Sequence, residues 1–443
     1  SVKFIHTADL HLGSSLHTEN EDTLKFNKGE NPVITSFHKL IDTAIIKKVD
    51  FVLIAGDLFD TEERSVKAVK EFNKGAKKLN NYNIDIYMIA GNHDPINEKH
   101  LLEILDNVYL FSSEKTEIKE YKVQNKLKAR IIGQSYRSSS DSRKMYENYN
   151  IVDNSVLNIA LLHTQLDRQN NNYVPGNLND LLKVKNIDYW ALGHIHKNKI
   201  LKKNKPLILY PGIPQGRDFG ESDLKGFYLI EFNSKKDYNI EFIASSKYIW
   251  KELNFTVSEK ENVKTFNELR KYIKENAFKI LMSNIETRRE KSITKNTLLT
   301  YIIRWKIKIE GLSDDDFNED KKEVENYLAE ELRNEFINNN FVRENFAIWT
   351  EDIRLELDAR IPDKEKLIKY DNIYKEIISE KERLINSKDI QNELKNVLGD
   401  IWQGSDDKEN RDQFRFSFKK EKNEIIEEAE KKLLIDLWNK RGE

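Results

Sequence analysis

The sequence of 443 residues contains no cysteine, which excludes disulfide bonds and any metal site built on thiolates. It also has no apolar run long enough to cross a bilayer. Its first residues, SVKFIHTADLHLG, are mixed and strand-like and lack the apolar segment of a signal peptide. From these absences we expect a cytoplasmic protein that does not associate with membranes.

An excess of positive charge is missing as well. The chain has 73 Lys and Arg residues against 75 Asp and Glu, a formal net charge of −2. This balance argues against a protein that coats nucleic acid through overall basicity, and a phosphate-binding surface must be a local patch or a metal site. Histidine is absent after His196, although the chain has 9. This distribution indicates a catalytic N-terminal domain followed by parts without catalytic residues.

The first half alternates buried strands with amphipathic helices, which predicts an α/β domain of layered sheets flanked by helices, with a largely parallel core. The chain then changes to closely spaced strands that suit an antiparallel continuation of the sheet. The predicted strands are 2–6, 51–55, 84–90, 129–133, 157–162, 188–192, 207–210, 226–232 and 239–244, and the helices are 33–48 and 64–80.

A smaller α+β unit and a helical region are predicted to follow. We place the domains at 1–249, 250–362 and 363–443, with Pro362 at the second boundary. The middle unit has predicted strands at 250–257 and 300–311, a strand pair within 346–359, and helices at 262–275 and 319–335. The last region has predicted helices at 364–386, 389–402 and 418–440, with a polar linker at 404–412.

Polar groups follow five of the predicted strands, at the point where each strand ends. Ligand sites of open α/β sheets form at the carboxyl ends of the strands, so we expect these side chains to meet. Each motif alone has a structural alternative: a helix cap, a turn, or, for His163, a core histidine. Their coincidence favours a shared metal site. The motifs are TADLHLG with Asp9 and His11, GDLFD with Asp57 and Asp60, GNHD with Asn92, His93 and Asp94, LLHTQ with His163, and GHIH with His194 and His196.

The donor types of this site indicate two divalent metal ions. Oxygen and imidazole donors without sulfur suit manganese, iron or zinc. Two ions roughly 3.5–4 Å apart bind the attacking and leaving oxygens of a phosphoester displacement. Asp57 is central in the strand order and is the carboxylate that we expect to bridge them.

Together, DLHLG, GDLFD, GNHD, LLHT and ALGHIHK resemble the calcineurin-like metallophosphoesterases. DYWALGHIHK (188–197) and YPGIPQGR (210–217) are similar to the SbcD branch of DNA-repair nucleases, which includes the bacterial YhaO-like exonucleases. The resemblance covers roughly residues 2–245 and implies a metallophosphoesterase sandwich, two divalent ions, Mn²⁺ foremost, and a DNA-positioning capping domain. It implies Asp9, His11, Asp57 and His196 around one ion and Asp57, Asn92, His163 and His194 around the other.

The resemblance also implies roles beside the metals. His93 faces the substrate, where it stabilises the transition state or protonates the leaving oxygen. Asp94 either orients the His93 ring or only forms the turn, and both readings stay open. Asp60 and Arg217 are candidate substrate-binding residues; in many relatives the residue matching Asp60 is a histidine.

The function implied is a metal-dependent nuclease that acts on DNA ends as an exonuclease, with endonuclease activity as a further possibility. Its implied partners are DNA, an SMC-like (SbcC-type) coiled-coil ATPase and a second copy of the chain. Two alternatives stay open: a small-molecule phosphodiesterase or phosphatase that works alone, and a DNA-binding scaffold with a vestigial site.

The last predicted helix has one continuous apolar face, which packs either on its own domain or in the groove of the ATPase. The face consists of Ile425, Ile426, Ala429, Leu433, Leu434, Leu437 and Trp438.

Overall fold

The computed structural model of the chain describes residues 1–18, 31–60, 66–96, 105–167, 172–261, 263, 265–286, 299–311, 320–338, 346–358, 372–386, 426–427, 429–430 and 432–434. The chain divides into two compact units. The first contains residues 1–254, 270–306 and 322–354, and the second contains residues 255–269, 307–321 and 355–443. No helix in the described ranges combines the length and apolar character that crossing a membrane requires.

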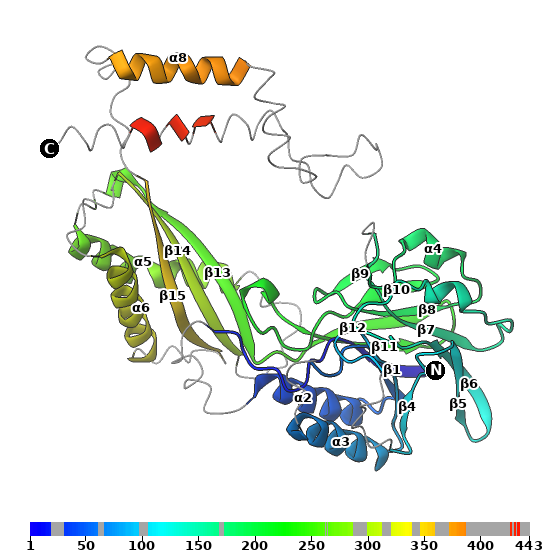
Figure 1. The fold of residues 1–443 in the computed structure, drawn as a ribbon. Coiled ribbons are helices and arrows are strands. Elements are labelled where there is room, and N and C mark those ends of the chain that lie inside the picture. The colour runs from blue at the N-terminus through cyan, green and yellow to red at the C-terminus, as the bar shows by residue number, and fades with distance from the viewer. Residues whose placement is uncertain are drawn as a thin grey trace. The chain divides into compact units, whose positions relative to one another are not determined.

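Two six-stranded mixed sheets form the main body of the first unit (Figure 1). In the first sheet, β1, β2, β3 and β4 run parallel, and β11 and β12 are antiparallel additions beside β1. This sheet has the order β12 (Tyr238–Ala244), β11 (Gly226–Phe232), β1 (Val2–Thr7), β2 (Phe51–Ala55), β3 (Asp85–Ile89), β4 (Val108–Leu110). The second has the order β5 (Glu117–Val123), β6 (Lys126–Gly133), β7 (Leu157–His163), β8 (Tyr189–Gly193), β10 (Leu207–Tyr210), β9 (Lys199–Lys202).

The layers follow from the alternation of side chains along each strand. In β1, Phe4 packs between the two sheets, whereas Ile5 packs under the helices. Helices α2 (Pro32–Ile46) and α3 (Val66–Asn80) lie side by side on that outer face (Figure 1). A third cluster around Trp190 covers the other face of the second sheet, below α4 (Leu178–Lys183). The predicted α/β sandwich, with layered mixed sheets flanked by helices, is thereby confirmed.

The late strands differ from the prediction of one continued sheet. β10 joins the second sheet parallel to β8, while β11 and β12 extend the first sheet. Strands β4, β5 and β9 and helix α4 were not predicted. β4 and β9 are only three and four residues long, and β5, with the sequence EIKEYKV, is a half-exposed strand without a clear apolar face. Such segments give little periodic signal.

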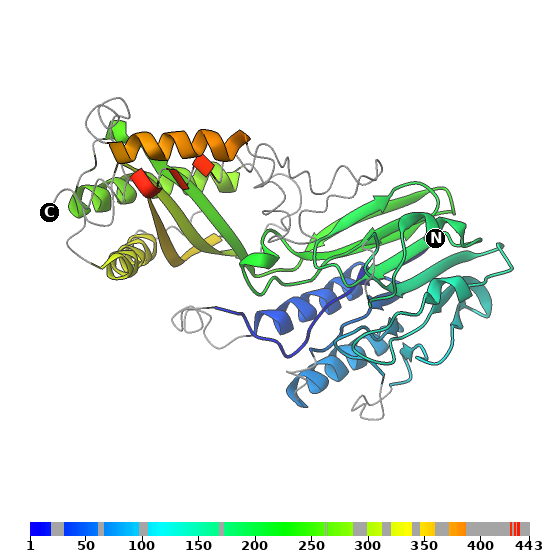
Figure 2. The same cartoon turned by 45° about the horizontal axis from the view of Figure 1, so that its top comes forward.

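Three long strands form a separate sheet in the order β13 (Tyr248–Val257), β14 (Leu299–Glu310), β15 (Phe346–Asp358). Figure 2 shows α5 (Phe266–Glu286) and α6 (Lys321–Asn338) along this sheet. The predicted strand pair within 346–359 is wrong, since one strand of 13 residues spans the range. No glycine or proline interrupts FAIWTEDIRLELD, so no turn forms. The domain boundaries stay a prediction.

The second unit includes α8 (Asn372–Asn386), which falls within the predicted helix 364–386. Leu434 is buried against Tyr374 and Ile377 of this helix, and Glu430 accepts a hydrogen bond from Lys381 at 2.7 Å. This part of the C-terminal region therefore packs on α8 (Figure 1). The predicted helix 389–402, the linker 404–412, Ile425, Leu437 and Trp438 lie outside the described residues.

Candidate metal centre

The carboxyl ends of the parallel strands in the two sheets meet at one edge of the sandwich. The His163 imidazole at the end of β7 is hydrogen-bonded through Nδ1 to the carbonyl oxygen of Ala55, the last residue of β2, at 2.9 Å. The backbone N–H of His194, which follows β8, donates to the Asp9 carboxylate at 3.0 and 3.1 Å. Motifs up to 185 residues apart in sequence are thus brought together.

One group of donors consists of Asp9, His11 and His196, whose potential ligand atoms all lie within 4.8 Å of one another. The Nε2 atoms of His11 and His196 face each other at 3.3 Å. Two nitrogens that bind one ion at ~2.1 Å lie about 3–3.4 Å apart in tetrahedral or octahedral coordination. The buried Nδ1 of His11 makes no hydrogen bond in the described part of the chain and lies 3.6 Å from the Asp60 carboxylate. This spacing fits a shared cation.

A second group consists of Asp57, His163 and His194. The amide oxygen of Asn92 lies 2.9 Å from Nε2 of His163 and 3.0 Å from Nδ1 of His194. The Asp57 carboxylate is 3.3 Å from the same Nε2 of His163 and is almost fully buried. Oxygen and nitrogen donors that converge in this way suit a divalent ion such as manganese, iron or zinc.

The backbone at these donors is held in an unusual conformation. Asp9, His11 and Asp57 have φ values of 51°, 45° and 51°, and His194 has a φ of 97°. Such conformations cost roughly 1–3 kcal/mol each and occur preferentially at functional sites. Gly91 permits the close packing that surrounds them, because a Cβ atom there would lie 2.2 Å from Oδ1 of Asp57.

Burial and mutual charge set the protonation of the donors. Burial lowers the pKa of His11 to about 3, and burial together with His163 lowers the pKa of His194 to about 3. Both imidazoles are thus neutral, which is the form that binds metals. Burial raises the pKa of Asp9 to about 6. Burial alone would raise the pKa of Asp57, but His163, His11 and His93 together outweigh burial and lower the pKa, so the carboxyl stays ionised.

His93 lies beside these groups and is more accessible. Its side chain is 39% exposed, and its Nδ1 is 3.3 Å from the Asp60 carboxylate. His11, Asp60 and His93 also form a compact group of donors. Among the residues that the structure describes, Asp60 supplies a carboxylate that contacts the His93 ring.

The hypothesis that Asp94 orients the His93 ring is wrong in this structure. Both carboxylate oxygens of Asp94 accept backbone N–H groups, from Leu58, Phe59 and Gly91, at 2.7 to 3.3 Å. Asp94 thus joins the GDLFD and GNHD loops, which corresponds to the turn-forming alternative.

Arg217 lies at the edge of the centre, but its guanidinium binds protein carboxylates. It donates to Asp60 at 3.3 Å and to Glu221 at 2.8 and 3.2 Å. Glu221 also accepts a hydrogen bond from Nδ1 of His196 at 2.7 Å. Sequence reasoning missed Glu221 because it follows no strand; its only signal is its position four residues after Arg217, within the segment RDFGE.

Three further histidines, His6, His17 and His38, have partners outside the two donor groups. His6 is fully buried between the Tyr189 hydroxyl and the Leu192 carbonyl, and burial lowers its pKa to about 3. His17 is paired with Asp218 and His38 with Glu71. These contacts suit a structural or surface role for the three side chains, and His100 lies outside the described residues.

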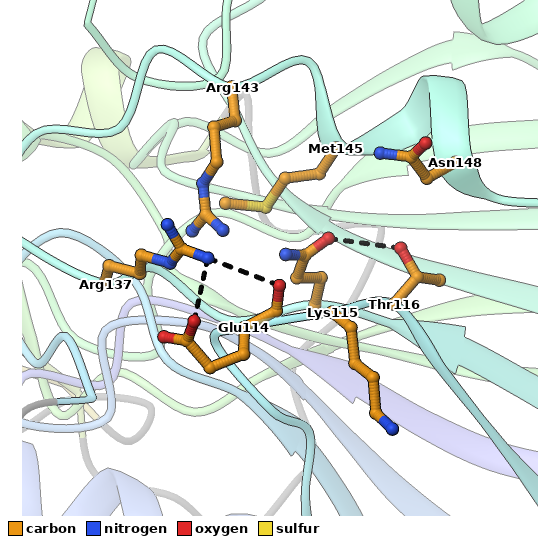
Figure 3. Close-up of a pocket in the computed structure, with 8 residues that line it drawn as sticks. Glu114, Lys115, Thr116, Arg137, Arg143, Met145 and Asn148 are labelled. Carbon is orange, nitrogen blue, oxygen red and sulfur yellow. Dashed lines mark hydrogen bonds and ion pairs between the residues drawn. The ribbon is translucent and has the colours of Figure 1, made fainter.

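A separate pocket of about 310 Å³ contains none of the predicted site residues (Figure 3). Its two arginines are matched by acids: Arg137 pairs with Glu114, as the dashed lines in Figure 3 show, and Arg143 pairs with Asp141. Its charges are therefore largely compensated within the protein.

The sandwich and the converging donors define the class of metallophosphoesterases. The sequence model of the calcineurin-like phosphoesterases matches residues 2–198. The metallophosphoesterase YhaO of Bacillus subtilis is 34% identical over 282 residues, which cover 61% of this chain and 69% of that protein. The chain belongs to the calcineurin-like phosphoesterase family, whose members use a dinuclear metal centre.

More distant relatives include DNA double-strand break repair proteins. The Mre11 protein of Methanocaldococcus jannaschii is 27% identical over 277 residues, which cover 60% of this chain and 72% of that protein. Among solved structures, a dimetal phosphatase from Danio rerio covers 54% of this chain and 98% of its own, with 10% identity and a TM-score of 0.33.

Proposed function

We propose that this protein is a two-metal-dependent DNA nuclease that hydrolyses phosphodiester bonds at DNA ends as an exonuclease, and that it also has endonuclease activity. The observation that carries the proposal is the pair of converging donor groups at the sheet edge, Asp9–His11–His196 and Asp57–His163–His194. The similarity to a DNA double-strand break repair protein supports DNA as the substrate.

In this proposal, Asp9, His11, Asp57 and His196 hold one ion, and Asp57, Asn92, His163 and His194 hold the other. Held by these residues, divalent ions, foremost Mn²⁺, would supply positive charge and an activated nucleophile for attack on phosphorus. The ring contacts of the histidines support this assignment. Nδ1 of His163 is hydrogen-bonded to a backbone carbonyl and Nδ1 of His196 to Glu221, so Nε2 of each ring is the atom directed at the donor group.

His93 is the proposed proton donor to the leaving oxygen. Asp60 contacts its Nδ1, which assigns proton transfer to Nε2. Since Asp60 and Arg217 are already paired with protein groups, Asp60 acts through His93 in this proposal, and Arg217 acts through Asp60.

The test is cleavage of defined substrates by the purified full chain in Mn²⁺. We expect end-labelled linear DNA to be shortened from its ends, with no cleavage when the metal is removed by chelation. The chromogenic diester bis(p-nitrophenyl) phosphate is run in parallel. Hydrolysis of the small diester without any cleavage of duplex or single-stranded DNA would contradict the nuclease proposal and favour the small-molecule phosphodiesterase. Metal binding without either activity would favour the scaffold.

We further propose that the C-terminal helices bind an SMC-like (SbcC-type) coiled-coil ATPase and that the chain works as a homodimer. Leu434 is only 1% exposed because it packs on α8, so it belongs to the interior of the helix pair. Leu433 is 51% exposed and Ile373 of α8 is 50% exposed. Exposed apolar side chains on such a pair suit a partner's groove better than solvent.

Leu433→Asp tests this docking role. A charge on the exposed side of the pair should weaken binding of the ATPase at least tenfold in a pull-down or calorimetric titration, while hydrolysis of bis(p-nitrophenyl) phosphate stays unchanged. Leu182→Asp is the control, because Leu182 is a 39% exposed leucine on α4 in the other unit. Full affinity of the Leu433 variant for the ATPase would refute the docking surface.

A further inference from the structure

Glu221 occupies a fixed and buried position beside the proposed metal centre. It ends a short 3₁₀ turn, Phe219–Glu221, which Asp218 caps by accepting the N–H groups of Gly220 and Glu221. The turn packs tightly on the preceding chain, because a Cβ atom at Gly216 would lie 2.4 Å from the Glu221 carbonyl oxygen. Only 8% of Glu221 is exposed, so its carboxylate must be neutralised by protein groups.

Two different groups share this carboxylate. Oε1 accepts from Nδ1 of His196 at 2.7 Å and from the Arg217 guanidinium at 2.8 Å. Oε2 accepts from the backbone N–H of Arg217 at 2.8 Å and from its Nε at 3.2 Å. These contacts lower the pKa of the Glu221 carboxyl and raise that of His196, although burial opposes both effects.

The contacts continue past Arg217 to the group proposed as proton donor. The Arg217 guanidinium donates to Oδ2 of Asp60 at 3.3 Å, and Oδ1 of Asp60 lies 3.3 Å from Nδ1 of His93. Glu221, Arg217 and Asp60 therefore form one chain of charged groups. At one end this chain of contacts reaches His196, which belongs to the donor group of Asp9 and His11, and at the other end it reaches His93.

We propose that Glu221 is a positioning residue that holds both ends of this chain: it directs Nε2 of His196 at one metal ion, and through Arg217 and Asp60 it orients His93. The inference rests on the proposed function. A carboxylate that accepts from Nδ1–H of a ligating histidine fixes the tautomer with the Nε2 lone pair toward the metal. The Glu221 carboxylate also neutralises Arg217, because a buried guanidinium that loses its anionic partner strongly destabilises the folded protein.

Because Glu221 acts on both His196 and His93, its effects on metal affinity and on turnover can be separated by mutation. Loss of the Glu221 charge should impair metal binding and catalysis together. Arg217→Lys keeps a cation near Glu221 but lacks the fork that also reaches Asp60, so it should lower turnover and leave metal affinity close to wild type. A merely structural role would predict loss of stability in both variants without selective loss of metal affinity.

The experiment compares Glu221→Gln with the wild type by calorimetric titration of the metal-free full chain with Mn²⁺. We expect the affinity for one of the two ions to fall by about 10–100-fold, the effect typical of losing such a carboxylate. The kcat for bis(p-nitrophenyl) phosphate should fall, with a smaller change in KM. Asp141→Asn is the control: Asp141 is 5% exposed and paired with Arg143, but it belongs to none of the donor groups. It should keep both affinities.

If the wild type binds both ions and Glu221→Gln has the same Mn²⁺ affinities and kcat, the role of Glu221 is refuted while the proposed function stands. Failure of the wild type to bind Mn²⁺ would instead overturn the proposed function. If circular dichroism shows that Glu221→Gln does not fold, Glu221→Asp decides. Its shorter carboxylate cannot reach both His196 and Arg217, so wild-type Mn²⁺ affinity and kcat in that variant would refute the proposal.

Discussion

Asp57→Asn is expected to abolish hydrolysis and to reduce the occupancy of both metal sites. The Asp57 carboxylate is buried, lies 3.3 Å from Nε2 of His163, and accepts the backbone N–H of His93 at 2.9 Å. An amide has one oxygen and no charge, so it cannot bridge two cations as a carboxylate does. With both ions affected, turnover of DNA and of small diesters should fall below detection.

Elemental analysis of Asp57→Asn after equilibration with Mn²⁺ and gel filtration measures this loss. Asp188→Asn is the matched control. Asp188 is equally buried and paired with Lys205 and Lys235, but it lies just before β8, at the opposite end of the strand from His194. This control should keep both ions. Two fully bound ions in the Asp57 variant would refute the bridging assignment.

His93→Asn is expected to keep both ions and DNA binding and to lose cleavage. His93 contacts Asp60 and has an accessible side chain, and it is absent from the two groups assigned to the ions in the proposal. General acid–base groups contribute about 10²–10⁴-fold to rate, and kcat should fall within that range. The measurement is kcat on end-labelled DNA in saturating Mn²⁺, together with metal content.

His38→Asn is the control for this variant, because His38 is a partly exposed histidine on α2 that pairs with Glu71 of α3. It should cleave DNA at the wild-type rate. Near-normal cleavage by His93→Asn would remove the acid role. Loss of a metal ion in the same variant would make His93 a ligand with His11 and Asp60.

The strands that deliver the site could be predicted from the sequence because they are buried apolar runs that end at a glycine or a polar cluster. FVLIA before Gly56 is such a run, and the described β2 matches it residue for residue. Strand partners could not be predicted in the same way, since pairing is a long-range property. LILY, residues 207–210, was placed on a continued sheet but joins β8 of the second sheet.

The groups that support the ligands were harder to predict. Asp94 follows His93 directly, and this proximity suggested a contact with its ring, yet backbone N–H groups occupy the Asp94 carboxylate. The ring instead contacts Asp60, 33 residues earlier. Glu221 reaches His196 across 25 residues of chain and follows no recognisable motif. Such contacts depend on tertiary packing that no local pattern encodes.

Anomalous diffraction from crystals grown with Mn²⁺ tests the two-metal centre most directly. We predict two peaks per chain, roughly 3.5–4 Å apart. One should lie against Asp9, His11 and His196, the other against Asn92, His163 and His194, and Asp57 should lie between them. A single peak, or two peaks that share no Asp57 oxygen, would contradict the account.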